Sequence, residues 1–352
     1  MARPSAHIMP PARQAVGRQP EHQEREDNEM KMGFKAFRKT GLALLAAVAT
    51  TALTAGAGHA ADTIRIGLST KAWFPSFVAE ITQQQGIFTK HDIKAELTVY
   101  QSGSEALTAI AAGAADLMSS NPSIVGEGRE AGVNVKMVAM LATRNFGWQI
   151  MVPPKSGIKT VADLAKHKVG ITSAGSNTDL LASWVKKKYG IDFIAIPVGG
   201  AGLVPNLISG NLDAVIIYPP LSYQVALDGN GRVLTDFSDV MPPHLEAGWA
   251  ADDEYAAKHK DALKRALTAL FEGVAYIKGN PDAVIPQLAK YDGISVEVAK
   301  QEYTNTFGHL SDDGAMTREL VQETLNLYPN GKKELDAAVL FDSSFTPVAI
   351  AR

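Results

Sequence analysis

The sequence contains no cysteine, and the common catalytic motifs are missing from it as well. Without thiols the chain has no disulfides, no cysteine nucleophile, no cysteine-bound metal and no lipid-anchoring cysteine. The HExxH, GxSxG and Walker patterns are also absent. We therefore expect a protein that is not an enzyme and that needs no cofactor.

Metal and dinucleotide sites also have little support. Five histidines follow residue 60, and their spacing suits no zinc site; they are His91, His167, His244, His259 and His309. The stretch 126–131, GEGREA, matches a loose dinucleotide-binding pattern, but it lies in a helical segment and does not follow a strand. We interpret it as a chance match.

The sequence has no apolar run of the roughly 20 residues that a membrane span needs. Its most apolar run, residues 41–51, follows several basic residues and precedes the small residues at 55–60. This order is typical of a secretory signal peptide, here cut after Ala60. Residues 1–60 are predicted to be a polar extension plus signal peptide, with translation starting at Met1, Met30 or Met32. The mature chain is expected free in the periplasm, not as a lipoprotein.

An excess of positive charge is missing too. Residues 61–352 contain 26 Lys and Arg against 32 Asp and Glu, a net charge of about −6. Because a nucleic-acid-binding domain normally carries a basic face, no nucleic-acid partner is expected.

Short apolar runs alternate with helical patterns, which is typical of a parallel sheet covered by helices. The expected strands are 63–68, 93–100, 116–119, 135–142, 147–152 and 169–172, with helices ending near residue 85 and spanning 104–112. Further helices are expected at 252–278, 282–291, 295–304 and 317–328, the first two capped by Asp252 and Asp282.

An internal repeat indicates two similar halves. The segment 113–122 has a counterpart at 210–219, with Gly, Asp and Pro at the same spacing. We predict two βαβ-type lobes whose strand ends face each other across a cleft, with Asp116 and Asp213 fixing turns. The lobes are expected at 61–148 and 149–248, followed by a return to lobe 1 and C-terminal helices over 249–352. Two crossings between lobes form a hinge.

The stretch 168–188 is predicted to be a strand, a small-residue turn and a helix start, with candidate caps at Asn177, Thr178 and Asp179. The free N–H groups at a helix start can hold a carboxylate, sulfonate or phosphate. An ordinary helix cap is the alternative.

Several segments together resemble one known family. They are IRIGLS at 64–69, SGSEALTAIAAGAADLMSS at 102–120, SGIKTVADLAKHKVGI at 156–171, GSNTDLLASWVKK at 175–187, LISGNLDAVIIYPP at 207–220 and DDEYAAKHKDALKRAL at 252–267. They are similar to the periplasmic substrate-binding proteins of ABC importers, in the group that binds sulfonates, taurine, nitrate or thiamine precursors. The resemblance implies an α/β, type II periplasmic binding protein. Such a protein, a monomer, closes on one small molecule and delivers it to an inner-membrane permease.

By position, the resemblance also implies which residues line the pocket. They are Ser69, Thr70, Trp73, Ser119, Ser120, Asn121, Arg144, Asn145, Ser173, Ser176, Asn177, Thr178, Gly199, Gly200 and Tyr218. Arg144 is the one strong base expected at the cleft, where its guanidinium would hold a carboxylate or sulfonate. A surface arginine or an interlobe salt bridge is the alternative. Phe146 joins Trp73 and Tyr218 as a candidate for an apolar wall.

The ligand stays open at this point. A small organic anion is the main hypothesis, and a neutral heterocycle such as a thiamine-pyrimidine precursor is the alternative if Arg144 points away from the cleft. An enzyme on the same fold is a further alternative, although the thiamine-pyrimidine synthases that resemble this family carry a cysteine-rich motif that this chain lacks. The sequence does not separate transport from sensing.

Overall fold

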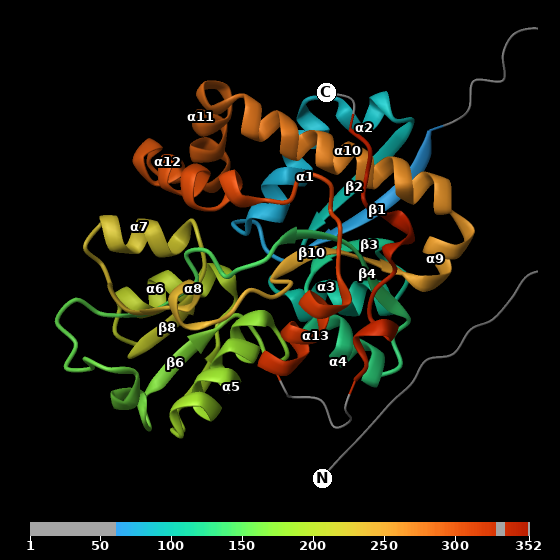
Figure 1. The fold of residues 1–352 in the computed structure, drawn as a ribbon. Helices are drawn as coiled ribbons and strands as arrows, with labels where there is room; N and C mark the ends of the chain where they lie inside the picture. The colour runs from blue at the N-terminus through green and yellow to red at the C-terminus, as the bar shows by residue number, and fades with distance from the viewer. Residues whose placement is uncertain (1–60, 329–334, 351–352) are drawn as a thin grey trace, which may run out of the picture. The chain divides into compact units, whose positions relative to one another are not determined.

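The computed structural model describes residues 61–328 and 335–350. The predicted signal peptide and its cleavage site lie outside these residues. Two five-stranded sheets organise the described chain, and helices cover them (Figure 1). We call the half built on each sheet the first lobe and the second lobe. The predicted fold class, two βαβ-type lobes with a helical C-terminal part, is confirmed.

The first lobe has the strand order β2-β1-β3-β10-β4. Strand β1 pairs in parallel with β2 and β3, whereas β10 is antiparallel to both β3 and β4. The strands are β1 (Asp62–Leu68), β2 (Ile93–Val99), β3 (Leu117–Ser120), β4 (Val135–Ala142) and β10 (Ala247–Asp252).

The second lobe repeats this arrangement with the order β7-β6-β8-β5-β9. Here β5 is the inserted antiparallel strand, between β8 and β9. Each lobe therefore receives one strand from the chain as it crosses the hinge. The strands are β5 (Gln149–Val152), β6 (Lys168–Ile171), β7 (Ile194–Pro197), β8 (Ala214–Ile217) and β9 (Arg232–Asp236).

Two aspartates make the same contacts at the start of each repeat. The Asp116 carboxylate accepts the N–H of Arg65 at 2.8 Å, and the Asp213 carboxylate accepts the N–H of Lys168 at 2.8 Å. Each aspartate also donates its own backbone N–H to that residue's carbonyl: Asp116 to Arg65 and Asp213 to Lys168, both at 2.9 Å. The two residues therefore join the turn to β1 in the first lobe and to β6 in the second, as the repeated Gly-x-x-Asp spacing predicts.

The chain crosses between the sheets at 143–148 and again at 241–246. Strand β5 lies entirely in the second sheet, and β10 is already in the first sheet from Ala247. The return thus comes slightly before residue 249, where the sequence places it.

The helices that surround the sheets fall into three groups along the chain. In the first lobe they are α1 (Phe74–Gln84), α2 (Ile87–Lys90), α3 (Gly103–Ala111) and α4 (Pro122–Glu130). In the second lobe they are η1 (Val161–Leu164), α5 (Asn177–Tyr189), η2 (Gly200–Gly202), α6 (Leu203–Ile208), α7 (Leu221–Leu227) and α8 (Phe237–Val240). The C-terminal group comprises α9 (Asp253–Lys258), α10 (Lys260–Gly279), α11 (Pro281–Asp292), α12 (Val296–Asn305), η3 (Phe307–His309), α13 (Arg318–Leu327), η4 (Ala337–Val339) and η5 (Ser343–Phe345).

Some predicted helix starts need correction. Asp252 caps α9 by accepting the N–H of Tyr255 at 2.8 Å, as expected, but the helix predicted over 252–278 is divided at His259. Asp282 lies inside the first turn of α11, whose N-cap is Asn280. In α5 the cap is Ser176, so that Asn177 is already helical. Residues 126 and 128 lie within α4, which agrees with a chance match to the dinucleotide pattern.

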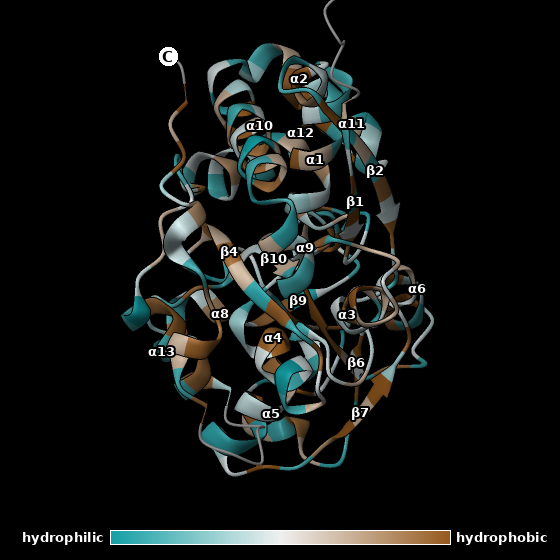
Figure 2. Ribbon diagram, turned by 90° about the vertical axis from the view of Figure 1, so that its right-hand side faces the viewer, coloured by the Kyte–Doolittle hydropathy of each residue, from teal (hydrophilic) through white to brown (hydrophobic). Residues whose placement is uncertain are grey.

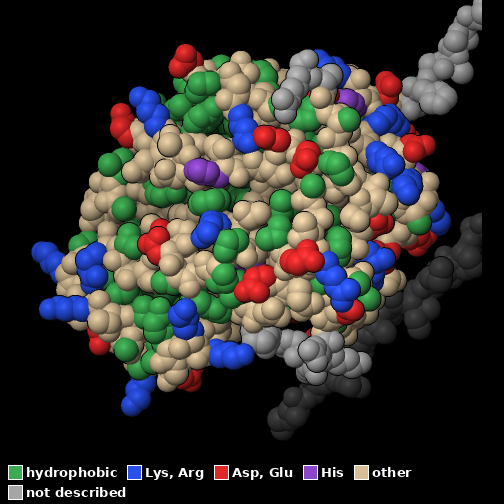
Figure 3. Space-filling view, in the orientation of Figure 1, with side chains coloured by type: hydrophobic (Ala, Val, Ile, Leu, Met, Phe, Trp, Pro, Cys, Tyr) green, Lys and Arg blue, Asp and Glu red, His purple; other side chains and the backbone are tan. Residues whose placement is uncertain are grey.

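The long helix α10 carries the C-terminal group onto the first lobe, where it packs against α1 and β1. Its buried residues recur at helical spacing, among them Leu263, Leu267, Leu270 and Val274. Figure 2 shows the resulting stripes of hydrophilic and hydrophobic residues on the helices. Acidic and basic side chains are interspersed on the face shown in Figure 3. No helix among the described residues is both long enough and apolar enough to span a membrane.

Gly248 in β10 offers a test of the strand insertion. A Cβ there would lie 2.1 Å from the Ala139 carbonyl oxygen of β4, a backbone atom that cannot move independently. We predict that Gly248→Ala lowers the free energy of unfolding by about 1–3 kcal/mol or more, as overpacking does. The matched control is Gly157→Ala, where a Cβ has no neighbour within 4 Å. Thermal denaturation of both variants measures the effect, and equal melting temperatures would contradict the described β10–β4 contact.

Candidate functional site

A pocket lies between the two lobes and is lined by residues of both. It encloses about 330 Å³ outside the protein atoms, part of it open to solvent. The lining residues are Ser69, Thr70, Trp73, Gly103, Ile124, Trp148, Thr172, Ser176, Asn177, Thr178 and Tyr218.

Seven of the fifteen residues expected from the sequence line this pocket: Ser69, Thr70, Trp73, Ser176, Asn177, Thr178 and Tyr218. Sequence reasoning missed Gly103, Ile124, Trp148 and Thr172. Thr172 follows β6 directly, so the strand-end rule could have found it. Trp148 is the last residue of the first crossing. An aromatic residue next to the hinge glycine Gly147 is a sequence signal that could have identified it as a lining residue.

Hydroxyl groups form the second-lobe wall of the pocket. The Thr178 hydroxyl accepts the N–H of Thr172 at 2.8 Å, and the Thr172 hydroxyl donates to the Ser176 hydroxyl at 2.7 Å. Ser176 and Thr178 are 2.8 Å apart through their hydroxyl oxygens. This network holds the first turn of α5 against the end of β6. In that turn the Asp179 N–H donates to the Ser176 carbonyl at 3.0 Å, and Asn177 and Thr178 supply the remaining N–H groups of the helix start.

A pair of buried amides joins the lobes beside the pocket. The Asn121 side-chain oxygen accepts the N–H groups of Ser123 and Ile124, each at 3.1 Å, and thereby caps α4. Its Nδ2 must therefore be the group that donates to Asn177 Oδ1, at 2.9 Å. This bond fixes the Asn177 amide with its Nδ2 as a buried donor that has no partner in the described structure.

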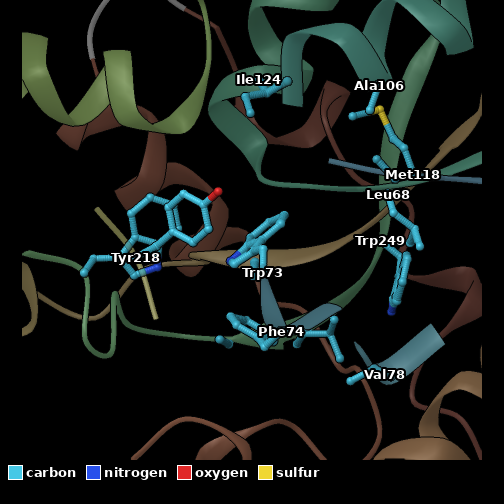
Figure 4. Packing of buried hydrophobic residues seen from close by; sticks show 14 of the residues in the cluster. Leu68, Trp73, Phe74, Val78, Ala106, Met118, Ile124, Tyr218 and Trp249 are labelled. Carbon is cyan, nitrogen blue, oxygen red and sulfur yellow. The ribbon is translucent and has the colours of Figure 1, made fainter. Parts of the chain in front are cut away.

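Three aromatic side chains form the opposite part of the pocket. The rings of Trp73 and Trp148 meet edge to face with centroids 6.4 Å apart, and Trp148 lies 5.1 Å from Tyr218. Figure 4 shows Trp73, Tyr218 and Ile124 around this space. Both pocket indole Nε1–H groups are buried and lack a partner within the described chain. The pocket thus combines an apolar wall with unused N–H donors.

Direct bonds across the cleft show that the lobes are closed. The Tyr218 hydroxyl of the second lobe donates to the Thr70 hydroxyl oxygen of the first at 3.2 Å. Burial raises the pKa of Tyr218 to about 12, so this phenol keeps its proton. Farther out, the hydroxyls of Ser104 and Ser173 are 2.7 Å apart.

Five of the remaining predicted residues support the pocket without lining it. The Ser119 hydroxyl accepts the Ser69 N–H at 3.0 Å, and Ser120 and Asn121 continue the same buried strand end. Gly200 lies behind Tyr218, because a Cβ on it would be 2.6 Å from the Tyr218 hydroxyl, and Gly199 precedes it, where a Cβ would be 3.6 Å from Gln101 Oε1.

The structure does not bring Arg144 into the pocket. Its guanidinium lies at the hinge and donates to the Ser238 carbonyl at 3.5 Å. Asn145 is buried at the hinge as well, near His244, whose pKa burial lowers to about 4. Phe146 stacks on His309 with centroids 4.9 Å apart and is not part of the pocket wall. The eleven lining residues therefore include no charged side chain.

No group of three or more His, Asp or Glu side chains within the described ranges could hold a metal ion. The polar atoms of the pocket are hydroxyls, an amide and two indole N–H groups. These are donors and weak acceptors, which suit an acceptor-rich organic molecule better than a cation.

Comparison with known sequences gives the family. Residues 75–284 match the family described as NMT1/THI5 like. The chain belongs to this family. A putative binding protein of Brucella abortus is 27% identical over 236 residues, which cover 65% of this chain and 71% of that protein. A putative aliphatic sulfonates-binding protein of Escherichia coli is 28% identical over 204 residues, 56% of this chain and 62% of that one.

Solved structures show the same fold. The periplasmic aliphatic sulphonate binding protein of Escherichia coli has a TM-score of 0.65 at 23% identity, covering 82% of this chain and 94% of that chain. The fold also occurs in an enzyme: a desulfurization enzyme, DszB, has a TM-score of 0.55 at 14% identity, covering 81% of this chain and 97% of that one. The chain therefore has the fold of the periplasmic binding proteins, which this family shares.

The Thr178 hydroxyl is predicted to stabilise the second-lobe wall. In Thr178→Val the buried Thr172 N–H loses its acceptor, which typically costs about 1–3 kcal/mol of the free energy of unfolding. Thr178→Ser keeps the oxygen and should stay close to the parent protein. Chemical denaturation measures both, and a valine variant as stable as the serine variant would contradict this role.

Proposed function

We propose that the protein is an extracytoplasmic solute-binding protein of an ABC importer, which captures a small organic anion between its lobes and delivers it to a membrane permease. Three observations support the proposal: the family, the two-lobe fold and a pocket lined by residues of both lobes. One of its relatives is described as a putative aliphatic sulfonates-binding protein. Release into the periplasm by a signal peptide cut after Ala60 is part of the same proposal.

The observation that carries the ligand class is the set of unpartnered donors in the pocket. Trp73 Nε1, Trp148 Nε1 and Asn177 Nδ2 are buried N–H groups without partners in the described chain. A buried donor left unsatisfied costs about 1–3 kcal/mol, so a ligand that supplies acceptor oxygens gains this energy. Sulfonates and carboxylates carry two or three such oxygens on one atom.

Neutral N–H donors are proposed to hold the anion, the role that the sequence analysis gave to the Arg144 guanidinium. The start of α5 adds backbone N–H groups and the positive end of the helix dipole. Together these groups can hold a negative charge without a cationic side chain. We propose the seven pocket residues predicted from the sequence, with Gly103, Ile124, Trp148 and Thr172, as the binding residues. The remaining eight are proposed to position them or to lie outside the site.

The first test is a thermal-shift screen of residues 61–352 against sulfonates, aliphatic and aromatic carboxylates, nitrate and thiamine precursors. A ligand at 100 times its dissociation constant stabilises the folded state by about 2.7 kcal/mol, which gives a measurable rise in melting temperature. We expect organic anions to produce the largest shifts. Stabilisation by neutral heterocycles alone would replace the proposed ligand class.

Two tryptophan variants test whether an indole N–H at the pocket binds the ligand, or whether the loss of any buried indole N–H has the same effect. Trp148→Phe removes a pocket N–H, and the lost bond to a charged acceptor should weaken binding of the best anion roughly tenfold or more. Trp249→Phe removes an indole N–H that is equally buried and unpartnered but lies outside the pocket. Isothermal titration calorimetry should show unchanged affinity for Trp249→Phe. Equal losses in both variants would refute the donor role of Trp148.

Arg144 provides the complementary control. Because its guanidinium faces Ser238 at the hinge, Arg144→Ala should bind the same anion with an affinity within about threefold of the parent protein. A loss of a hundredfold or more would restore Arg144 as the anchor of the ligand.

A neutral heterocycle is the second candidate, and the pocket gives a specific reason for it. The lining residues carry no charge, and two indoles and a phenol offer faces for stacking on a flat ring. The same titrations distinguish the two classes, because a neutral ring gains little from the α5 dipole. A sulfur-chemistry enzyme is less well supported, since the pocket lining contains no Cys, His, Lys, Asp or Glu to act as a nucleophile or base.

A further inference from the structure

A contact between the lobes, outside the pocket, brings two acidic side chains together. Glu127 lies on α4 of the first lobe, and Asp179 lies on α5 of the second. Gly175, in the turn before α5, touches both. Its N–H donates to Asp179 Oδ2 at 2.9 Å, and a Cβ on it would lie 3.2 Å from Glu127 Oε2. The two carboxylates therefore border the same turn, one from each lobe.

Among the described residues, the charged groups that shift the pKa of Glu127 are both negative. They are Asp179 across the cleft and Glu130 on the same helix. The cations on the neighbouring elements pair elsewhere: Arg129 of α4 binds Asp253, and Arg318 of α13 binds Asp336. On α3, Glu105 adds a further carboxylate, which accepts the N–H of Gln101. Closing the lobes thus places Glu127 in a half-buried position among acids.

We propose that closing the cleft takes up a proton at Glu127, so that acid favours the closed form and alkali favours the open form. The inference goes beyond solute capture and does not depend on which molecule fills the pocket. Its basis is the contact between Glu127 and the turn at Gly175, which forms only when the lobes meet.

The direction follows from proton linkage. In the closed form the pKa of Glu127 is raised from 4.5 to about 7, mainly by burial and also by the charges of Asp179 and Glu130. In an open form the turn at Ser173 to Ser176 would move away and the Glu127 carboxyl would face water. The pKa of Glu127 would then return toward 4.5. Between pH 4.5 and pH 7 the closed form therefore binds more protons than the open form. Raising the pH from 6 to 8 should weaken closure by about tenfold.

The chain offers a direct probe of closure, because it has no cysteine of its own. The hydroxyl oxygens of Ser104 and Ser173 are 2.7 Å apart across the cleft. In Ser104→Cys/Ser173→Cys, a disulfide forms only when the lobes close, so its rate of formation reports the closed fraction. The rate is compared with and without Glu127→Gln, which keeps the shape of the side chain and removes its charge.

Comparing the two proteins at one pH cancels the intrinsic pH dependence of thiol oxidation, and the second readout below removes the effect of the Glu127 charge on the nearby thiols. It also cancels the contribution of Asp292, a buried carboxyl whose pKa is raised to about 7 and which both proteins retain. We expect Glu127→Gln to form the disulfide about 30-fold faster at pH 6 and about 300-fold faster at pH 8, because the open-form carboxylate is already ionised at pH 6 and the closed-form carboxyl loses its proton only above about pH 7. A matched control, Glu96→Gln on the exposed outer strand β2, should change no rate.

Equal rates at pH 8 with and without Glu127→Gln would overturn the proposal. So would a ratio that does not fall between pH 8 and pH 6. A second readout avoids any dependence on the cysteine pair at the contact: spin labels at Lys187→Cys and Lys264→Cys, two exposed positions on different lobes. At pH 8 the short interlobe distance should be more populated in Glu127→Gln, and identical distance distributions would again reject the idea.

Discussion

The bond between Asn121 and Asn177 is the contact on which the arrangement of the pocket depends. One amide caps α4 with its oxygen and has only its nitrogen left for the other lobe. The second amide must receive that nitrogen with its oxygen, which leaves its own nitrogen as a donor at the pocket. A helix cap in the first lobe thereby decides which atom the second lobe presents to a ligand.

This dependence explains how a pocket without charged side chains can suit an anion. Buried donors are costly to leave unpaired, and here three of them belong to residues that line one pocket. In an open cleft the same groups could bind water. Closing removes that water, so a ligand with acceptor oxygens restores the lost bonds and shifts the balance toward the closed form. Recognition and closure are then two aspects of the same set of hydrogen bonds.

Much of the fold could be predicted from the sequence, because its signals are local. The alternation of Ile64, Ile66 and Leu68 reports a strand, and the repeated Gly-x-x-Asp spacing reports two equivalent turns. The position of Arg144 could not be predicted in this way. Its place near the cleft follows from chain order, but the direction of its guanidinium depends on the Ser238 carbonyl, more than ninety residues later in the chain. Trp148 was missed for a similar reason, since its contact with Tyr218 depends on the pairing of β5 with β8, which brings together residues far apart in the chain.

The edges of the cleft and its interior use opposite electrostatic arrangements. Inside, neutral donors and a helix start favour negative charge, whereas at the α4–α5 contact Glu127 and Asp179 oppose closure when both are ionised. A closed state that is too stable would hold its solute and release it slowly. Repulsion at the edge lowers the stability of closure without weakening any contact to the ligand, because Glu127 does not line the pocket. The affinity for the solute and the ease of opening can therefore be set by different residues.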